Sequence, residues 1–192
     1  MKTIALSLLL ISAAGAADFR LGIIGTDTSH VQLLTAAFND PSGRDHVPGF
    51  RVVAAYKGGS PDVESSYARV DKFAAELESK WNVEIVPDIP TLCQKVDGIL
   101  LESVDGRRRL EQARQVIAAH KPMFIDKPLA STLEDVREIS RLAKAAGVPW
   151  FSQDGATNYR IAVARVTLRR GESSGAEPHT KGVGRTCLKY AL

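Results

Sequence analysis

The chain has 192 residues, of which 44% are hydrophobic and 24% are charged. This composition is typical of a globular protein and excludes a disordered or fibrous chain, and the length suffices for one domain and part of a second. The net charge of +3 is unevenly divided, because residues 18–154 carry 17 basic and 20 acidic side chains whereas residues 155–192 carry seven basic and two acidic ones. No basic folded face is indicated, so no nucleic acid partner is expected.

The N-terminus has the three parts of a Sec-type signal peptide. The first two residues form a short positive start, residues 3–13 are an apolar run, and residues 14–16 have the small-x-small pattern of a signal-peptidase site. We expect cleavage after Ala16 or Ala17 and export to the periplasm or the extracellular space. A buried N-terminal strand or helix is the alternative. No other run has the length and hydropathy of a transmembrane helix, so no membrane attachment is expected after cleavage.

The first half of the remaining chain alternates predicted strands with predicted helices. In chain order these are a strand at residues 20–24, a helix that opens at 29–32 and continues to 38, a strand at 51–56, a helix at 65–80, a strand at 83–86 and a turn with some helical character at 87–95. Ser29 and Gln32 have the spacing of a capping box, so the Ser29 hydroxyl is expected to cap the first helix.

The second half continues the alternation to residue 151. It contains a strand at residues 98–101, a helix at 110–119, a strand at 123–125, a helix that opens with a capping box at 131–134 and closes at Gly147, and a strand at 148–151. This repeated alternation predicts an α/β fold with a doubly wound parallel sheet over residues 18–152, whose ligand lies at the carboxyl ends of the strands.

The alternation ends after residue 152. Residues 161–168 could form one more strand, but residues 171–184 are short of the large apolar side chains from which a core is built. We therefore expect residues 153–192 to form a short irregular tail. The abrupt change in composition favours a truncated or frame-shifted reading of a longer gene.

The turn after the first strand is where a dinucleotide-binding fold holds the pyrophosphate on backbone N–H groups. Its residues are Gly25, Thr26, Asp27, Thr28, Ser29 and His30. The glycine fingerprint of such a turn is kept only at Gly25, and the Asp27 side chain is expected to hinder the pyrophosphate and to repel its charge. Three hydroxyl groups are available as donors. A modified anion or nucleotide site and a helix-capping turn without a ligand are about equally supported by this turn alone.

Charged residues follow the second and fourth predicted strands. Lys57 stands where an acidic residue normally binds the ribose hydroxyls, so it favours a 2′-phosphate or another anion, unless it is a solvated surface lysine. Glu102 and Asp105 are expected to face the ligand cleft at the end of the fourth strand. The arginines at 107–109 are interpreted as the solvated start of a helix.

Asp126, Lys127 and Pro128 directly follow the fifth predicted strand, at the same edge of the sheet. A lysine in this position can donate to a substrate oxygen, or relay a proton if burial lowers its pKa. Pro128 fixes the turn and keeps Lys127 out of helical geometry. The alternative is a surface turn with a solvated lysine.

The histidines and cysteines indicate little about function. His30 is a candidate acid or base without an evident partner, and His46, His120 and His179 lack ligand-like spacing, so no metal site is predicted. Cys93 is interpreted as a small buried hydrophobe, although an oxidising compartment would permit a disulfide with the distant second cysteine.

Four segments resemble the Gfo/Idh/MocA family, which includes glucose–fructose oxidoreductase and inositol dehydrogenase. These segments are residues 21–25, 96–99, 111–113 and, most strongly, 121–130 (KPMFIDKPLA), which is similar to the family's G-K-x-V-x-x-E-K-P-x-A segment. The resemblance covers about residues 19–152. It implies a Rossmann domain, NAD or NADP as cofactor, and Lys127 as the active-site lysine, with Asp126 in place of the usual glutamate.

The resemblance also defines the expected site and its departures. The catalytic residues would be Lys127 and Asp126, and the cofactor contacts would come from residues 25–30, Lys57, Glu102 and Pro128. This chain departs from the family's pattern at the lost glycines, at Lys57, and at Arg109, which stands roughly where the family often has histidine.

The family's second α/β domain usually supplies the catalytic histidine and the substrate face, and the roughly 40 residues after residue 151 are too few to form it. The resemblance implies a small-molecule sugar or polyol substrate, and a homo-oligomer is one option for assembly. A non-catalytic exported binding protein and an inactive fragment with a degenerate cofactor site are the alternatives.

Overall fold

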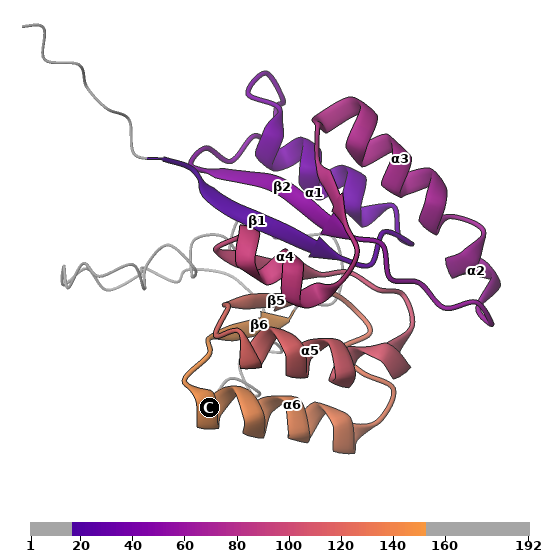
Figure 1. Cartoon of the computed structure of the whole chain (residues 1–192), viewed down its shortest axis with the longest axis vertical. Helices are drawn as coiled ribbons and strands as arrows, with labels where there is room; N and C mark the ends of the chain where they lie inside the picture. The colour runs from indigo at the N-terminus through magenta and orange to yellow at the C-terminus, as the bar shows by residue number, and fades with distance from the viewer. Residues whose placement is uncertain (1–16, 153–192) are drawn as a thin grey trace, which may run out of the picture.

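A computed structural model describes residues 17–152, which form a six-stranded sheet with helices on both faces (Figure 1). The strands are β1 (Phe19–Ile24), β2 (Phe50–Tyr56), β3 (Glu84–Val86), β4 (Gly98–Leu101), β5 (Met123–Ile125) and β6 (Trp150–Ser152). All neighbours are parallel, and the order across the sheet is β3-β2-β1-β4-β5-β6. This is the order of a Rossmann fold, so the predicted doubly wound parallel sheet is confirmed.

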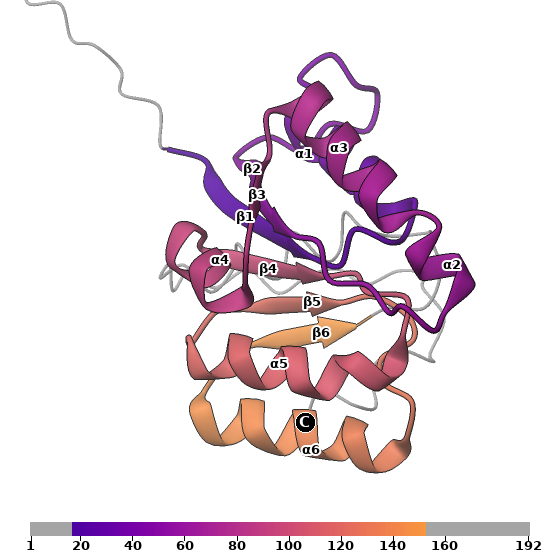
Figure 2. The ribbon, with the colours of Figure 1, turned by 45° about the vertical axis from the view of Figure 1, so that its right-hand side comes forward.

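The helices divide between the two faces of the sheet (Figure 2). They are α1 (His30–Asn39), α2 (Glu64–Tyr67), α3 (Val70–Trp81), α4 (Ile89–Lys95), the 3-10 helix η1 (Gly106–Arg108), α5 (Arg109–Ala118) and α6 (Leu133–Ala146). Side chains of α1 and α3 share one core with the sheet, and side chains of α4, α5 and α6 share the other. The chain changes face between β3 and β4, which places the topological switch point between the neighbouring strands β1 and β4.

The alternation of side chains along the strands fills both cores. In β4, Ile99 and Leu101 belong to the core beneath α4, α5 and α6, whereas Leu100 belongs to the core beneath α1 and α3. Because β4 is buried on both faces, its run of apolar residues follows from its central place in a parallel sheet. Cys93 on α4 is buried among these side chains and forms no disulfide within residues 17–152. Burial raises the pKa of its thiol, so its interpretation as a small buried hydrophobe is confirmed.

Both predicted capping boxes differ from the structure. Ser29 makes no side-chain cap, because its backbone is already right-handed helical, and the Thr28 hydroxyl accepts a bond from the His30 backbone N–H instead (3.3 Å). At α6 the cap is Thr132, whose backbone is extended and whose hydroxyl accepts from the Asp135 backbone N–H (3.1 Å). An N-cap needs extended backbone geometry, and this requirement selects the residue.

The single helix predicted at residues 65–80 is wrong, since the segment is broken into α2 and α3. Ser66 of α2 is fully buried, donates to the Asp27 carboxylate (2.6 Å) and accepts from the Ser60 backbone N–H (2.8 Å). These contacts hold α2 to the first turn and to the loop after β2. The turn predicted at residues 87–95 is the seven-residue helix α4, which Asp88 caps by accepting from the Thr91 backbone N–H.

Parts of the predicted organisation lie outside the described residues. These are residues 1–16 of the expected signal peptide and the whole expected tail, including the strand considered at residues 161–168. No helix of the described part, residues 17–152, is long and apolar enough to cross a membrane.

Candidate functional site

The expected site residues lie after the carboxyl ends of four strands, at one edge of the sheet. The turn of residues 25–30 follows β1, Lys57 follows β2, Glu102 follows β4 and Asp126 follows β5. Backbone bonds extend the strand pairing to two of them, because the Glu102 N–H donates to Ile24 O (2.7 Å) and the Asp126 N–H donates to Leu101 O (3.0 Å). The sheet therefore holds these positions side by side.

Gly25 is required by the close approach of the segment after β4. Its φ is +90°, and a Cβ at this position would lie 2.4 Å from Ser103 Oγ and 2.5 Å from the Ser103 backbone nitrogen. Only glycine avoids both the strained backbone and the collision. The next residue, Thr26, is fully buried and its hydroxyl donates to Val70 O (2.8 Å), so it serves the fold and is not a free donor for a ligand.

Asp27 does not present its charge to the ligand side of the turn, contrary to the sequence expectation. Its side chain is fully buried, and its carboxylate accepts from Ser66 Oγ (2.6 Å) and from the Val104 backbone N–H (3.2 Å). The carboxylate joins the first turn to α2 and to the segment after β4. The expected repulsion of a pyrophosphate is therefore weakened by the direction of the side chain and by its hydrogen bonds.

Three consecutive backbone N–H groups of the turn are without an acceptor within residues 17–152, and of their three residues only Ser29 is well exposed. No group of the described residues accepts a hydrogen bond from the backbone N–H of Asp27, Thr28 or Ser29. These N–H groups directly precede α1, where the helix dipole adds partial positive charge. The turn thus has the backbone hydrogen-bond donors and the positive electrostatic potential of an anion site, although it lacks two of the three fingerprint glycines.

Lys57 pairs with Asp71 on α3, so neither sequence interpretation describes it fully. Both side chains are well exposed, at 44% and 78% of their full accessible surface. An exposed ion pair of this kind contributes little and can exchange one partner for another. Lys57 therefore remains available to an anion at the end of β2.

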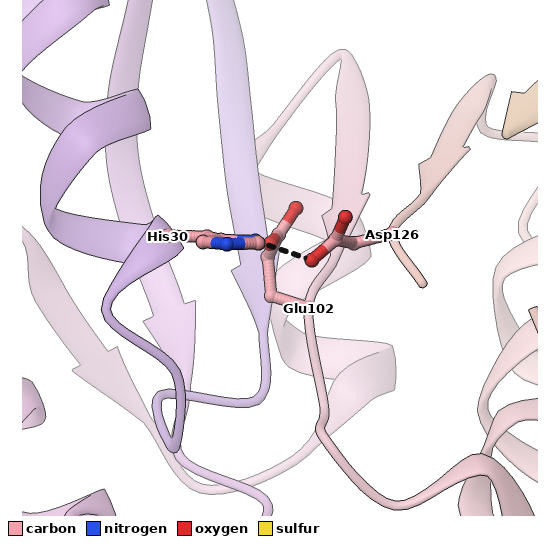
Figure 3. Close-up of side chains that lie close together, drawn as sticks. All are labelled: His30, Glu102 and Asp126. Carbon is pink, nitrogen blue, oxygen red and sulfur yellow. Dashed lines mark hydrogen bonds and ion pairs between the residues drawn. The ribbon is translucent and has the colours of Figure 1, made fainter. Parts of the chain in front are cut away.

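His30, Glu102 and Asp126 converge from α1, β4 and β5 (Figure 3). His30 Nδ1 lies 2.6 Å from Asp126 Oδ2, and both side chains are largely buried. Glu102 is only 1% exposed, and within the described chain neither of its carboxylate oxygens has a hydrogen-bond donor as partner. Burial first, and then the neighbouring charge of Asp126, raise the pKa of Glu102 to about 8. In the absence of another cation, Glu102 is therefore mostly protonated at neutral pH and can share its proton with Asp126.

Arg109 is buried, contrary to the prediction of a solvated arginine run. It is 0% exposed, its guanidinium donates to Leu101 O, and its Nε and Nη2 groups have no partner among the described residues. Burial lowers the pKa of Arg109 to about 10, against the opposing effect of Glu102, Asp126 and Asp27, so it stays charged at neutral pH. The short helix η1 explains the difference, because it leaves residues 107 and 108 exposed and turns residue 109 beneath the sheet edge.

Asp105, which was expected to face the cleft, is instead held inside a local network. Its carboxylate accepts from Ser60 Oγ (2.6 Å) and from the Arg107 guanidinium (2.8 Å). Arg107 also binds Asp62 in front of α2 (2.8 Å). This network holds the loop after β2 against η1. The Asp105 carboxylate is therefore not free to bind a ligand.

Lys127 and Pro128 lie at the same edge and are both exposed. The peptide bond between them is cis. The burial on which a proton-relay role for Lys127 depends is not provided by the described residues. Its role as a donor to a substrate oxygen stays a prediction.

Fold and site together define a nucleotide-binding domain of the Rossmann type. The chain belongs to the oxidoreductase family with an NAD-binding Rossmann fold, Gfo/Idh/MocA, whose sequence profile matches residues 19–153. The resemblance seen in the sequence is therefore confirmed. No match was found among proteins of curated function.

Solved structures share the fold at low sequence identity. A dehydrogenase from Clostridium difficile is 22% identical with a TM-score of 0.52, and covers 70% of this chain and 38% of its own. An oxidoreductase from Agrobacterium radiobacter, solved with NAD⁺, L-tartaric acid and magnesium, is 16% identical with a TM-score of 0.57 and covers 79% and 40%. A protein from Thermotoga maritima described as a probable dehydrogenase is 22% identical with a TM-score of 0.54, and covers 70% of this chain and 35% of its own. The chain thus spans 35–40% of the length of these structures.

Proposed function

We propose that this chain binds a nicotinamide dinucleotide across the carboxyl edge of its sheet, with the pyrophosphate on the first turn. The observation that carries the proposal is the set of three unbonded N–H groups of Asp27, Thr28 and Ser29 between Gly25 and α1. A pyrophosphate supplies the acceptors and the negative charge that such a turn lacks. The inward direction of the Asp27 carboxylate weakens the main objection to this placement, which is charge repulsion.

The end of β2 favours NADP over NAD. Lys57 occupies the position from which an acidic residue usually binds the ribose hydroxyls of NAD. Its partner Asp71 is exposed, so a ribose 2′-phosphate can replace that carboxylate at little cost. We therefore propose NADP as the preferred cofactor, with NAD bound more weakly.

The chemistry proposed for the whole enzyme is hydride transfer between the cofactor and a small sugar or polyol. Lys127 would donate to the substrate oxygen, and Asp126 would be the second catalytic residue beside it. Lys127 is exposed at this edge, so its ammonium group is accessible to a substrate. A protein that binds the dinucleotide without turnover is the alternative, and an assay with sugars and polyols would separate the two.

Export of the mature protein is a further part of the proposal. The three-part pattern of the first 17 residues supports it. The protein would then take up its cofactor outside the cytoplasm, as a monomer or a homo-oligomer. Mass spectrometry of the secreted protein tests this directly, because cleavage after Ala16 or Ala17 fixes the mature mass, and an uncleaved chain would contradict it.

Thermal unfolding with NADPH tests the cofactor site. A ligand at 100 times its Kd stabilises a native protein by about 2.7 kcal/mol, which raises Tm by several degrees for a domain of this size. Ser29→Glu places a negative charge beside the three N–H groups, where it repels a pyrophosphate. The same charge interacts favourably with the dipole of α1, so the fold is retained. Ser29→Ala is the matched neutral control.

We expect NADPH to raise the Tm of the wild-type and Ser29→Ala proteins and to leave Ser29→Glu unchanged. No rise in the wild-type protein at millimolar NADPH or NADH would refute cofactor binding. An equal rise in all three proteins would place the dinucleotide elsewhere on the surface.

A further inference from the structure

One imidazole and two carboxylates meet at the switch point of the sheet in a geometry that metal ions use. One ligand atom from each of His30, Glu102 and Asp126 lies within 4.8 Å of the other two. Figure 3 shows the three side chains approaching one another from three different segments. Each residue is fixed by its backbone, at the first position of α1 and directly after β4 and β5.

Glu102 is the member of this group that the protein alone does not satisfy. It is 1% exposed, and no donor group of the described residues reaches either carboxylate oxygen. A carboxylate in such a place needs a proton or a cation. The cluster around it offers an imidazole nitrogen and a second carboxylate, both of which are ligands for divalent metals.

The buried charged residues around the cluster are mostly acidic. Three carboxyl groups, those of Asp27, Glu102 and Asp126, are at most 3% exposed, and the guanidinium of Arg109 is the only arginine or lysine cation buried with them in the described chain. Acidic side chains thus outnumber basic ones in the buried surroundings of the cluster, and a cation suits this excess of carboxyl groups.

We propose that His30, Glu102 and Asp126 form a binding site for a divalent transition-metal ion, with Zn²⁺ as its representative. A tetrahedral zinc ion holds its ligand atoms about 3.4 Å apart, given metal–ligand distances of about 2.1 Å. The His30–Asp126 separation is 2.6 Å and none of the three ligand-atom separations exceeds 4.8 Å, which is close to that spacing.

Three protein ligands leave one coordination position open to water or to a substrate oxygen. The site also joins α1, β4 and β5 at the edge where the dinucleotide is proposed to bind. The metal site does not rest on the cofactor proposal, because its ligands are the side chains of the cluster whereas the pyrophosphate is held by backbone N–H groups of the first turn.

Titration of Zn²⁺ alone into the chelator-treated full chain tests this site. We expect one equivalent to bind with micromolar or tighter Kd and to raise Tm. Glu102→Gln and His30→Gln should each weaken binding by at least about 100-fold. Glu84→Gln and His120→Asn are the matched controls, since they replace an exposed carboxylate and an exposed imidazole far from the cluster and should leave Kd unchanged.

X-ray absorption of the zinc-loaded wild-type protein keeps the inference testable if a variant fails to fold. The expected first shell contains one imidazole nitrogen and oxygen donors, without sulfur. A sulfur ligand, two or more imidazoles, no binding at one equivalent, or unchanged binding in folded Glu102→Gln and His30→Gln would each overturn the site. A chain that binds NADPH but not Zn²⁺ refutes the metal site alone, and the reverse result refutes the cofactor proposal alone.

Discussion

At the scale of single residues, burial and partners decide what each charged group does, and the arginines after β4 show this clearly. Arg107 is exposed and bound to two carboxylates, whereas Arg109, two positions later, is fully buried beneath the site. A run of like charges in a sequence is normally a solvated surface, so the sequence could not distinguish the two. Their difference depends on the direction of η1, which only the folded chain defines.

Acid should remove the stabilisation contributed by Asp105. Hydrogen bonds from the Arg107 guanidinium, and then the one from the Ser60 hydroxyl, hold the pKa of this carboxyl well below its usual range. A carboxyl whose folded pKa is depressed stabilises the fold above its unfolded pKa of about 3.9 and loses that contribution as pH falls towards the folded value. The free energy of unfolding of Asp105→Asn should therefore lie about 1–3 kcal/mol below wild type at pH 7.

Urea unfolding between pH 7 and pH 3 checks this prediction. The difference between the wild-type protein and Asp105→Asn should shrink below pH 4, because the native carboxylate then begins to lose its advantage. Asp18→Asn, at an exposed position before β1, is the control and should match wild type throughout. A difference that is independent of pH would mean that Asp105 acts through its shape and not through its charge.

Lys57 should determine the choice between the two cofactors. Removing the ammonium group in Lys57→Ala takes away the proposed partner of the 2′-phosphate, while NAD has no such group to lose. We expect the Kd for NADPH to rise at least tenfold and the Kd for NADH to change less than threefold, as measured by titration calorimetry. Lys144→Ala on α6 is the matched control. Equal losses for both cofactors would contradict a role for Lys57 in recognising the 2′-phosphate.

At the scale of elements, strand and helix positions could be predicted because apolar periodicity is local, whereas their ends could not. Ser131 and Thr132 both carry a hydroxyl before α6, and the sequence alone does not say which backbone is extended. Next to the break between α2 and α3, Ser66 of α2 bonds to Asp27, which is 39 residues away. Such boundaries are set by contacts between segments, which a local pattern does not contain.

Substitutions before α6 test directly whether Thr132 is its N-cap. Thr132→Ala removes the acceptor for the Asp135 backbone N–H at the start of α6 and should lower the free energy of unfolding by about 1 kcal/mol. Thr132→Ser keeps the hydroxyl and should change the free energy of unfolding by only a few tenths of that amount. Urea unfolding of these proteins beside Ser131→Ala decides the matter, because a larger loss for Ser131→Ala would restore the cap at the earlier residue.

At the scale of the whole molecule, the parallel sheet explains why part of the site was predictable. The carboxyl ends of parallel strands lie at one edge of a sheet, so the residues that follow these strands were expected there. The structure places four such residues at that edge, namely Gly25, Lys57, Glu102 and Asp126. The close approach of His30, Glu102 and Asp126 was not predicted, because it depends on β4 lying between β1 and β5 and on the directions of the three side chains. Sequence spacing is a poor guide to metal ligands that come from separate strands.

The most direct test of the proposed pyrophosphate site is an amide NMR titration of the isotope-labelled chain with NADPH. Binding on the first turn predicts that the backbone amides of Asp27, Thr28 and Ser29 shift most and that all three saturate with one Kd. The Lys57 amide should also shift with NADPH but not with NADH. Saturable shifts confined to other parts of the chain, or no shifts at millimolar cofactor, would contradict the assignment of this turn as a pyrophosphate site.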